Sequence, residues 1–441
     1  MLKRKVEQAL TAWKKNPSRS PLVVKGPRQC GKTFSVVDFA QKNYKNVHYL
    51  NFFEHKELAD VFSGSLTVDN IIMNLSALIG PSAIFEPHDT CLIFDELQEC
   101  PEARTSLKFF KMDGRYDVIC TGSLLGIRGY GVMPRSVPVG YEETITMNPL
   151  DFEEFLWANG INENVFKLLN ECFEQEKPVP EVIHNRMMEL LMQYTIVGGM
   201  PEVVNIFIES KQIGLVVNKQ RQILDGYRDD MIKYANAADK PLICDCFDSI
   251  PMQLSKENKK FQYSIVKKGS TAARFAGSLR WCEDAGIIRR CNNLEITELP
   301  LDGNAINDVF KVYMADTGLF VAMLEDGTQH DILNGNLYGY KGAIFENLIA
   351  DIFGKMGRKL YYFHKESGLE IDFVIRYKGE CVPIEVKAST GNTKSTKTLL
   401  AHPEKYHVSR AIKFGNYNVG MSGDILTLPT YMAFMLQRDG M

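Results

Sequence analysis

The pattern with the clearest chemistry lies near the N-terminus, where Gly26-Pro-Arg-Gln-Cys-Gly-Lys-Thr33 fits the phosphate-binding pattern G-x-x-x-x-G-K-[ST] in full. An apolar strand predicted at residues 22–25 precedes it and a helix predicted at 32–41 follows it. Glycines let backbone N–H groups turn towards phosphates, and the helix N-terminus adds positive potential. Lys32 would contact the β- and γ-phosphates, and Thr33 would ligate Mg²⁺. The predicted phosphate contacts are Gly26, Pro27, Arg28, Gln29, Cys30, Gly31, Lys32 and Thr33.

A second pattern is an apolar run that ends in two acids, Cys91-Leu-Ile-Phe-Asp95-Glu96, and it is typical of a central parallel strand. Asp95 would hold Mg²⁺ through water, and Glu96 would polarise the attacking water. Alone, the run fits equally a strand that ends in a solvated turn. After a phosphate loop, the acidic pair is favoured, so the two patterns predict a nucleoside triphosphate with Mg²⁺ as the cofactors, and they predict that Glu96 and Lys32 act in catalysis.

The next predicted strand ends at Thr121-Gly-Ser123, where Thr121 and Ser123 could sense the γ-phosphate. A plain Gly-Ser turn is the alternative. Arg128 and Arg135 follow in a glycine-rich stretch, and either could supply positive charge to the transition state, in cis or to a neighbouring subunit. We take Arg135 as the candidate catalytic arginine, although a solvated loop arginine fits the sequence as well.

Together with later segments, these motifs resemble the AAA-type ATPases of bacteria and archaea that carry a C-terminal DUF4143 domain. The resemblance covers nearly the whole chain. It implies ATP as the nucleotide and an ASCE-type sheet in which the Asp-Glu strand lies beside the strand of the phosphate loop, with a winged-helix module behind it. The segments that carry the resemblance are the phosphate loop, Phe94–Gln98, Thr121–Ser123, Pro149–Phe155, Tyr194–Pro201, Tyr227–Asp230 and Val312–Gly318.

The C-terminal part carries a second set of acids, Glu346, Asp372 and Glu385, with Lys387 close behind. An aspartate followed by E-x-K resembles the PD-(D/E)xK nuclease fold, although Ile371 stands where that motif often has proline. Residues i and i+2 of a strand share a face, so Glu385 and Lys387 would lie together. The carboxylates could bind Mg²⁺ as a second site and Lys387 could position water. A surface ion-pair ladder, or a nuclease fold without activity, is the alternative.

The segment Lys256–Arg280 contains seven basic residues and one acid, Glu257, and it overlaps the expected winged helix. We therefore consider DNA a candidate partner of this segment and of the C-terminal domain. Winged helices also serve as protein-contact modules, so a protein partner stays open. The basic residues are Lys256, Lys259, Lys260, Lys267, Lys268, Arg274 and Arg280.

Composition limits the class of protein. The chain of 441 residues has a net charge of −3, so it is not a nucleic-acid binder by overall charge. Its ten cysteines include no CxxC pair, which favours reduced thiols and a cytoplasmic location. The charged N-terminal residues 1–15 predict an amphipathic helix, not a signal peptide, and no apolar stretch reaches the ~18 residues of a membrane span.

The predicted fold class is α/β, with a P-loop parallel sheet of the ASCE or AAA type, a helical and winged-helix-like middle, and a nuclease-like α/β C-terminal domain. The predicted function is Mg-dependent ATP binding and hydrolysis that drives a conformational change in the C-terminal half, with DNA as a candidate target and a homo-oligomer as a candidate state. A slow nucleotide-gated switch and an ATP-dependent nuclease stay as alternatives. The predicted domains are 1–150, 151–235, 236–300 and 301–441.

Overall fold

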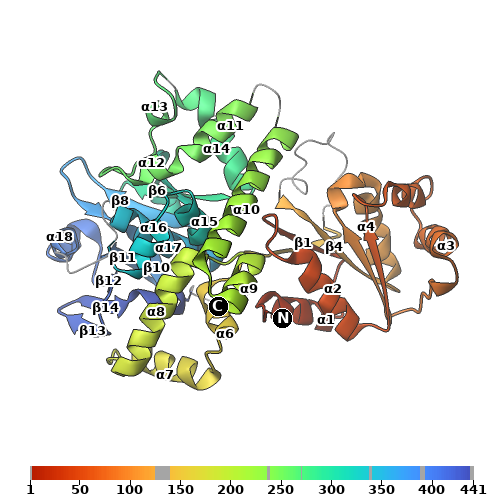
Figure 1. The fold of residues 1–441 in the computed structure, drawn as a ribbon, viewed down its shortest axis with the longest axis horizontal. Helices are drawn as coiled ribbons and strands as arrows, with labels where there is room; N and C mark the ends of the chain where they lie inside the picture. Colours follow the sequence, from red (N-terminus) through yellow and green to blue (C-terminus); the bar gives the residue numbers. More distant parts are fainter. Residues whose placement is uncertain are drawn as a thin grey trace.

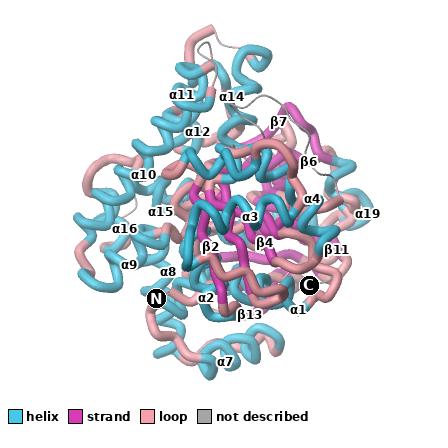
Figure 2. The backbone as a smooth tube through the Cα atoms, turned by 90° about the vertical axis from the view of Figure 1, so that its right-hand side faces the viewer, coloured by secondary structure: helices cyan, strands magenta, loops and turns pink. Residues whose placement is uncertain are grey.

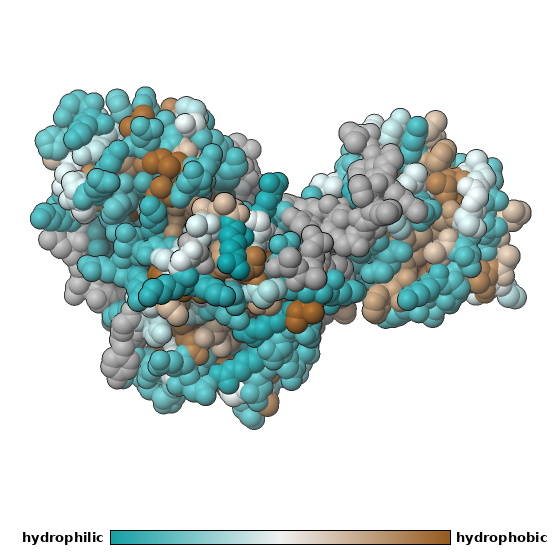
Figure 3. Space-filling view, turned by 90° about the horizontal axis from the view of Figure 1, so that it is seen from above, coloured by the Kyte–Doolittle hydropathy of each residue, from teal (hydrophilic) through white to brown (hydrophobic). Residues whose placement is uncertain are grey.

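The computed structural model describes residues 2–124, 140–235, 239–269, 271–336, 340–387 and 393–437. The first strands and helices form one lobe and the later elements form a larger second lobe (Figure 1). Helix α10 (Ile213–Tyr234) lies on the side of the large lobe that faces the small one. Seen from above, both lobes present mainly hydrophilic faces (Figure 3). Across the described ranges, no helix combines the length and the apolar character that a bilayer span needs.

The small lobe is built on a five-stranded sheet in the order β2-β3-β4-β1-β5, and every neighbouring pair is parallel. Helix α3 and strands β2 and β4 of this lobe face the viewer in Figure 2. Continuous apolar runs make the inner strands, because a parallel strand is covered on both faces. The elements of the lobe are α1 (Val6–Lys15), β1 (Leu22–Gly26), α2 (Lys32–Asn43), β2 (Asn46–Asn51), α3 (Val68–Ile79), β3 (Thr90–Asp95), α4 (Pro101–Asp113), β4 (Asp117–Ser123) and β5 (Glu143–Thr146).

The expectation that the Asp-Glu strand lies beside the strand of the phosphate loop is wrong. Strand β4 lies between them, because it pairs with β1 on one side and with β3 on the other. The register places Val24 opposite Thr121 and Ile93 opposite Ile119. The carboxyl end of β4 therefore lies between the phosphate loop and the acidic pair, which brings Thr121 to the middle of the site.

A helical segment follows, and its first helix begins where the sequence predicts. Asp151 accepts a hydrogen bond from the backbone N–H of Glu154 (2.9 Å), and the Glu154 carboxylate accepts one from the backbone N–H of Asp151 (3.0 Å). This capping box satisfies two backbone donors at the helix start. The helices are α6 (Phe152–Ala158), α7 (Glu163–Glu174), α8 (Glu181–Val197), α9 (Pro201–Ser210) and α10. The predicted break at Gly198-Gly199 separates α8 from α9.

Four helices then lead into a hairpin. Helix α14 and then strand β6 lie within residues 236–300, where the winged-helix-like module is predicted, and the module itself stays a prediction. Strand β6 pairs with β7 in antiparallel fashion and with β8 in parallel, so the predicted units 236–300 and 301–441 share one sheet, in the order β7-β6-β8-β9. The elements are α11 (Lys240–Asp248), α12 (Ile250–Leu254), α13 (Tyr263–Val266), α14 (Ala272–Asp284), β6 (Ile288–Leu294), β7 (Ala305–Met314) and β8 (Leu360–His364).

The last part of the chain forms a second mixed sheet, in the order β10-β11-β12-β14-β13. The strand predicted at residues 371–375 is interrupted at Asp372, so that β9 and β10 join different sheets. The remaining elements are α15 (Thr317–Ala322), α16 (Thr328–Leu333), α17 (Lys341–Lys355), β9 (Glu370–Ile371), β10 (Phe373–Tyr377), β11 (Glu380–Val386), α18 (Lys394–Leu400), α19 (Pro403–Tyr406), β12 (Ala411–Gly415), β13 (Gly420–Ser422) and β14 (Ile425–Pro429).

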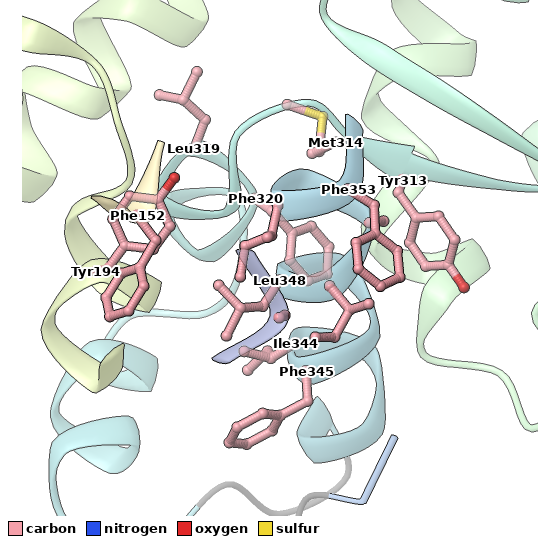
Figure 4. Packing of buried hydrophobic residues seen from close by; sticks show 14 of the residues in the cluster. Phe152, Tyr194, Tyr313, Met314, Leu319, Phe320, Ile344, Phe345, Leu348 and Phe353 are labelled. Atoms are coloured by element: carbon pink, nitrogen blue, oxygen red, sulfur yellow. The ribbon is translucent and has the colours of Figure 1, made fainter. Parts of the chain in front are cut away.

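Helix α17 is the centre of the large lobe, and residues 343–354 of this helix are all buried. Ile344, Leu348 and Phe353 project from it into a cluster that also contains Phe320 (Figure 4). The same cluster includes Phe152 from the start of the helical segment. Because one core joins these distant segments, the large lobe is packed as one unit.

Candidate nucleotide-binding site

The loop Gly26–Thr33 connects β1 to α2 at the carboxyl edge of the parallel sheet. Gly31 has φ of +90° and Gln29 has φ of +60°, so the backbone is left-handed twice within the loop. At Gly26 a side chain would meet the carbonyl oxygen of Met147 at 2.2 Å. A glycine is therefore required there by close backbone approach, and the loop has the tight turn that a phosphate cradle needs.

Lys32 lies over this loop, and its ammonium group donates to the carbonyl oxygens of Gly26 (3.1 Å) and Pro27 (2.8 Å). The ammonium is thus held at the mouth of the loop by the loop's own backbone. Its predicted contact with phosphate requires an exchange of these neutral acceptors for charged oxygens, which form stronger hydrogen bonds.

Asp95 is the centre of the site and is only 4% exposed. Its carboxylate accepts hydrogen bonds from the hydroxyl of Thr33 (3.2 Å to either oxygen), from that of Thr121, and from that of Tyr49 (2.5 Å). Burial, and then the bond to Asp95, raise the pKa of Tyr49, which keeps it a donor. Three predicted residues, Thr33, Asp95 and Thr121, are therefore in contact, and Tyr49 is a neighbour that the sequence did not reveal.

Glu96 follows Asp95 with φ of 53°, which turns its side chain away from the strand direction. Its backbone N–H donates to Asp95 (3.0 Å), and its carboxylate accepts a hydrogen bond from the side-chain amide of Gln98. A non-glycine residue in the left-handed region is uncommon and costs free energy. Glu96 is thus placed at the site, with its carboxylate held by a neighbour.

A cavity of about 610 Å³ opens in front of the phosphate loop, a size that suits a nucleotide. One side is formed by the loop with Glu96, Glu99 and Ser123. The other side is formed by the helical segment that follows the small lobe, through Pro201, Glu202 and Asn205 of α9 and Lys233 of α10. The two lobes therefore enclose the candidate site together.

Arg28 links the loop to α10 directly, since its guanidinium lies 2.8 Å from the carboxylate of Asp230. Burial raises the pKa of Asp230 to about 6, although Arg28 acts in the opposite direction. The pair connects the phosphate loop to a helix of the other lobe, and a nucleotide phosphate would compete with Asp230 for the guanidinium.

Arg4, in the N-terminal segment, holds the back of the loop. Its guanidinium donates to the carbonyl oxygens of Cys30 (3.0 Å) and Asn148 (2.6 Å) and to the carboxylate of Glu154 (3.1 Å). Both charged side chains of this pair are nearly buried. Arg4 therefore fixes the phosphate loop to the capping box at the start of α6.

Comparisons with known families agree with this geometry. Residues 18–156, which hold the loop and the acidic pair, match a family model described as AAA domain, and residues 341–431 match one described as a domain of unknown function, DUF4143. The chain carries an AAA domain and a DUF4143 domain. Residues 188–330, which include α9 and α10, match a further domain of unknown function, DUF8612.

Comparison with solved structures finds distant resemblances. A Walker-type ATPase of Pyrococcus abyssi is 14% identical over 73% of this chain and 96% of its own, with a TM-score of 0.43. The ORC2 protein of Aeropyrum pernix, in ADPNP–ADP complexes, is 11% identical over 75% of this chain and 92% of its own, with a TM-score of 0.38. No curated protein matches the chain.

Arg128 and Arg135, the arginines predicted to follow Thr121-Gly-Ser123, lie outside the described residues. Of the other predicted contacts, Cys30 is buried and offers its backbone, whereas Arg28, Gln29 and Ser123 line the cavity.

In the DUF4143 domain, Glu346 is bonded to cations instead of standing open to a metal. Lys259 lies 2.5 Å from one carboxylate oxygen and Lys311 3.5 Å from the other, which also accepts a hydrogen bond from Tyr313 (2.9 Å). Burial alone would raise the pKa of Glu346, but the ammonium groups of Lys311 and Lys259 hold it below its usual range. Lys259, assigned above to a DNA-binding segment, is thus engaged inside the protein.

The other members of this acidic set are also engaged. Asp372 accepts a hydrogen bond from the backbone N–H of Val386 (2.7 Å), and burial, together with the charge of Glu346, raises its pKa to about 7. Glu385 pairs with Lys387 (2.5 Å), which agrees with the shared strand face. Among the described residues no group of three or more acids, histidines or cysteines is arranged to hold a metal ion. Glu346 and Glu385 are thus paired with ammonium groups, and the second Mg²⁺ site stays a prediction.

Proposed function

We propose that this protein binds Mg-ATP in the cavity in front of Gly26–Thr33 and hydrolyses its γ-phosphate. The observation that carries the proposal is the contact between Thr33 and Asp95, which come from the phosphate loop and the acidic strand. Hydroxyl and carboxylate oxygens are the donors that Mg²⁺ prefers, so Thr33 and Asp95 fit that ion. When bound, the ion supplies positive charge against the phosphate oxygens.

The side chains then have separate tasks. Lys32 exchanges the carbonyl oxygens of Gly26 and Pro27 for phosphate oxygens and thereby orients the substrate. Glu96 accepts a proton from the attacking water once its carboxylate is free of Gln98. Thr121, at the carboxyl end of β4, fixes the orientation of Asp95.

The same proposal gives the cavity walls of α9 and α10 a role. ATP phosphates that attract Arg28 weaken its pair with Asp230, so nucleotide binding and release alter the contact between the phosphate loop and α10. This would pass a conformational change to the C-terminal half, where residues 236–300 are proposed to act as a winged-helix-like module with DNA as a candidate partner.

The binding step is tested by calorimetric titration of Mg-ATP into the wild type, Lys32→Ala and Lys42→Ala. Lys42 lies on the same helix but pairs with Asp38 on the surface, so it is a matched control. We expect Lys32→Ala to weaken binding by roughly tenfold or more, since it removes a charge-assisted contact. Equal affinity of Lys32→Ala and the wild type would contradict the proposed site.

A slow nucleotide-gated switch is the second candidate function. It is favoured by one observation, that Lys32 and Glu96 are both bonded to neighbouring protein groups. If those contacts persist with ATP bound, nucleotide is held without rapid turnover. Tight ATP binding without phosphate release, with or without DNA, would favour the switch over the ATPase.

A further inference from the structure

A large cavity lies away from the candidate nucleotide site, between the AAA domain and the sheets of the large lobe. Its volume is about 720 Å³. A second cavity of about 550 Å³ shares Asp302, Arg358, Lys359 and Tyr361 with it, so the two form one groove. We call this the basic groove, after the five cationic residues that line the larger cavity: Lys25, Arg289, Arg290, Arg358 and Lys359.

The charges of the groove do not balance. Two acids, Glu283 and Asp302, line it against the five cations. Glu283 pairs with Arg290 (3.2 Å) and Asp302 pairs with Lys359 (3.0 Å). Both acids are thus matched by a cation of their own, and the groove keeps an excess of positive charge.

Lys25 supplies part of that excess from the AAA side. It belongs to β1, next to the phosphate loop, and its side chain is half-buried. Within the ranges that the structure describes, its ammonium group makes neither a hydrogen bond nor an ion pair. A cation in that position has lost part of its hydration without gaining a partner.

Arg289 supplies a further part from the opposite wall, on β6. Its guanidinium donates one hydrogen bond, to the side chain of Asn148 (3.2 Å), while its Nε is buried and, among the described residues, has no hydrogen-bond partner. The side chain crosses α17 at Gly354, where a Cβ would lie 2.1 Å from Nε. The nearby carboxylate of Asp351 is paired with Lys355 (2.9 Å). The Arg289 guanidinium is thus held in place, and some of its N–H groups remain available to a ligand.

We propose that the basic groove binds the phosphate groups of a second ligand, separate from the nucleotide of the P-loop. Arginine and lysine on facing walls are the groups that recognise phosphate, and an anion between them relieves the repulsion of like charges. The ligand is either a strand of nucleic acid or a free polyphosphate, which offer the same chemistry. A cavity of this volume accommodates a few phosphate-bearing units and is too small for a duplex to lie within it.

The groove also lies directly behind the phosphate loop. Pro27 and Leu124 of the AAA domain line it, and a Cβ at Gly286, in the turn before β6, would lie 3.0 Å from Pro27 and 2.6 Å from Leu124. A ligand held by Lys25 and Arg289 therefore bridges the two lobes next to the loop that holds ATP.

The test measures binding to a protein that already carries Lys32→Ala, so that the P-loop does not contribute and the result is independent of ATP hydrolysis. A fluorescent oligothymidylate is titrated at low salt by anisotropy, and inorganic tripolyphosphate is titrated by calorimetry. Lys25→Gln and Arg289→Gln are compared with Lys167→Gln, an exposed lysine of α7 outside both the groove and the segment Lys256–Arg280. Thermal melting confirms that each variant is folded. If Arg289→Gln does not fold, Lys25→Gln still tests the proposal.

We expect each groove variant to weaken binding roughly tenfold, with Lys167→Gln unchanged, and the affinity to fall as salt rises. If the oligothymidylate binds, the ligand is a nucleic-acid strand. If only tripolyphosphate binds, with the same loss in the variants, the ligand is a free polyphosphate. The proposal is overturned if neither anion binds, if Lys25→Gln binds as tightly as its parent, or if Lys167→Gln loses as much affinity as the groove variants.

Discussion

Single residues decide how firmly the phosphate loop is held, and Arg4 is the clearest case. It joins three places at once, namely Cys30 in the loop, Asn148 beyond β5, and Glu154 in the capping box. Burial raises the pKa of Glu154 more than Arg4 lowers it, so that carboxylate depends on its partner. Removing one member of a buried ion pair leaves an uncompensated charge, which costs more than the pair itself contributes.

The change Arg4→Ala should therefore lower the free energy of unfolding by roughly 3–5 kcal/mol. Thermal melting followed by circular dichroism measures this, with Lys15→Ala as the control because Lys15 is an exposed basic residue of α1. If the two variants melt alike, the loop does not depend on the Arg4 contacts.

At the scale of elements, the sequence predicted what is local and missed what depends on pairing in space. The phosphate loop and the acidic strand are each defined by a run of consecutive residues, so Thr33 and Asp95 could be assigned to one site. The position of β4 between β1 and β3 could not, because strand order is set by tertiary packing and not by sequence adjacency. The role of Asp230 was hidden for the same reason, since only the fold brings α10 to Arg28.

The C-terminal acids show both what the sequence predicts locally and what it hides. Glu385 and Lys387 share a face as the strand period predicts. The sequence could not show that Lys259 and Lys311, distant along the chain, reach Glu346. A cluster of acids has the same appearance in a sequence whether a metal or an ammonium group neutralises it.

At the scale of the whole molecule, the matched segments meet at a buried polar junction. Lys355 of α17 pairs with Asp351 (2.9 Å) and Asp316 (3.1 Å) and donates to Tyr194 (2.9 Å). Asp316 in turn accepts from the backbone N–H of Gly199 (2.7 Å). These residues come from the DUF8612 and DUF4143 segments, and Tyr194 donates to the carbonyl of Leu150 at the end of the AAA domain (3.0 Å). Through Tyr194, the buried Lys355 ammonium therefore connects all three matched segments.

We expect Lys355→Met to leave two buried carboxylates without a cation and to destabilise the protein by roughly 3–5 kcal/mol. Chemical denaturation followed by tryptophan fluorescence measures the loss. Lys341→Met, at the other end of α17, is the matched control. If Lys355→Met has the same denaturation midpoint as the wild type, the Lys355 ammonium does not hold the junction together.

Phosphate release tests most directly whether this protein hydrolyses ATP with Glu96 as the base. Glu96→Gln is compared with Glu99→Gln, since Glu99 lines the same cavity but lies outside the Asp-Glu pair. We predict that Glu96→Gln still binds Mg-ATP but releases phosphate roughly 10²–10⁴-fold more slowly, while Glu99→Gln stays near the wild type. Phosphate release by Glu96→Gln at the wild-type rate, or none from the wild type despite tight ATP binding, would contradict it.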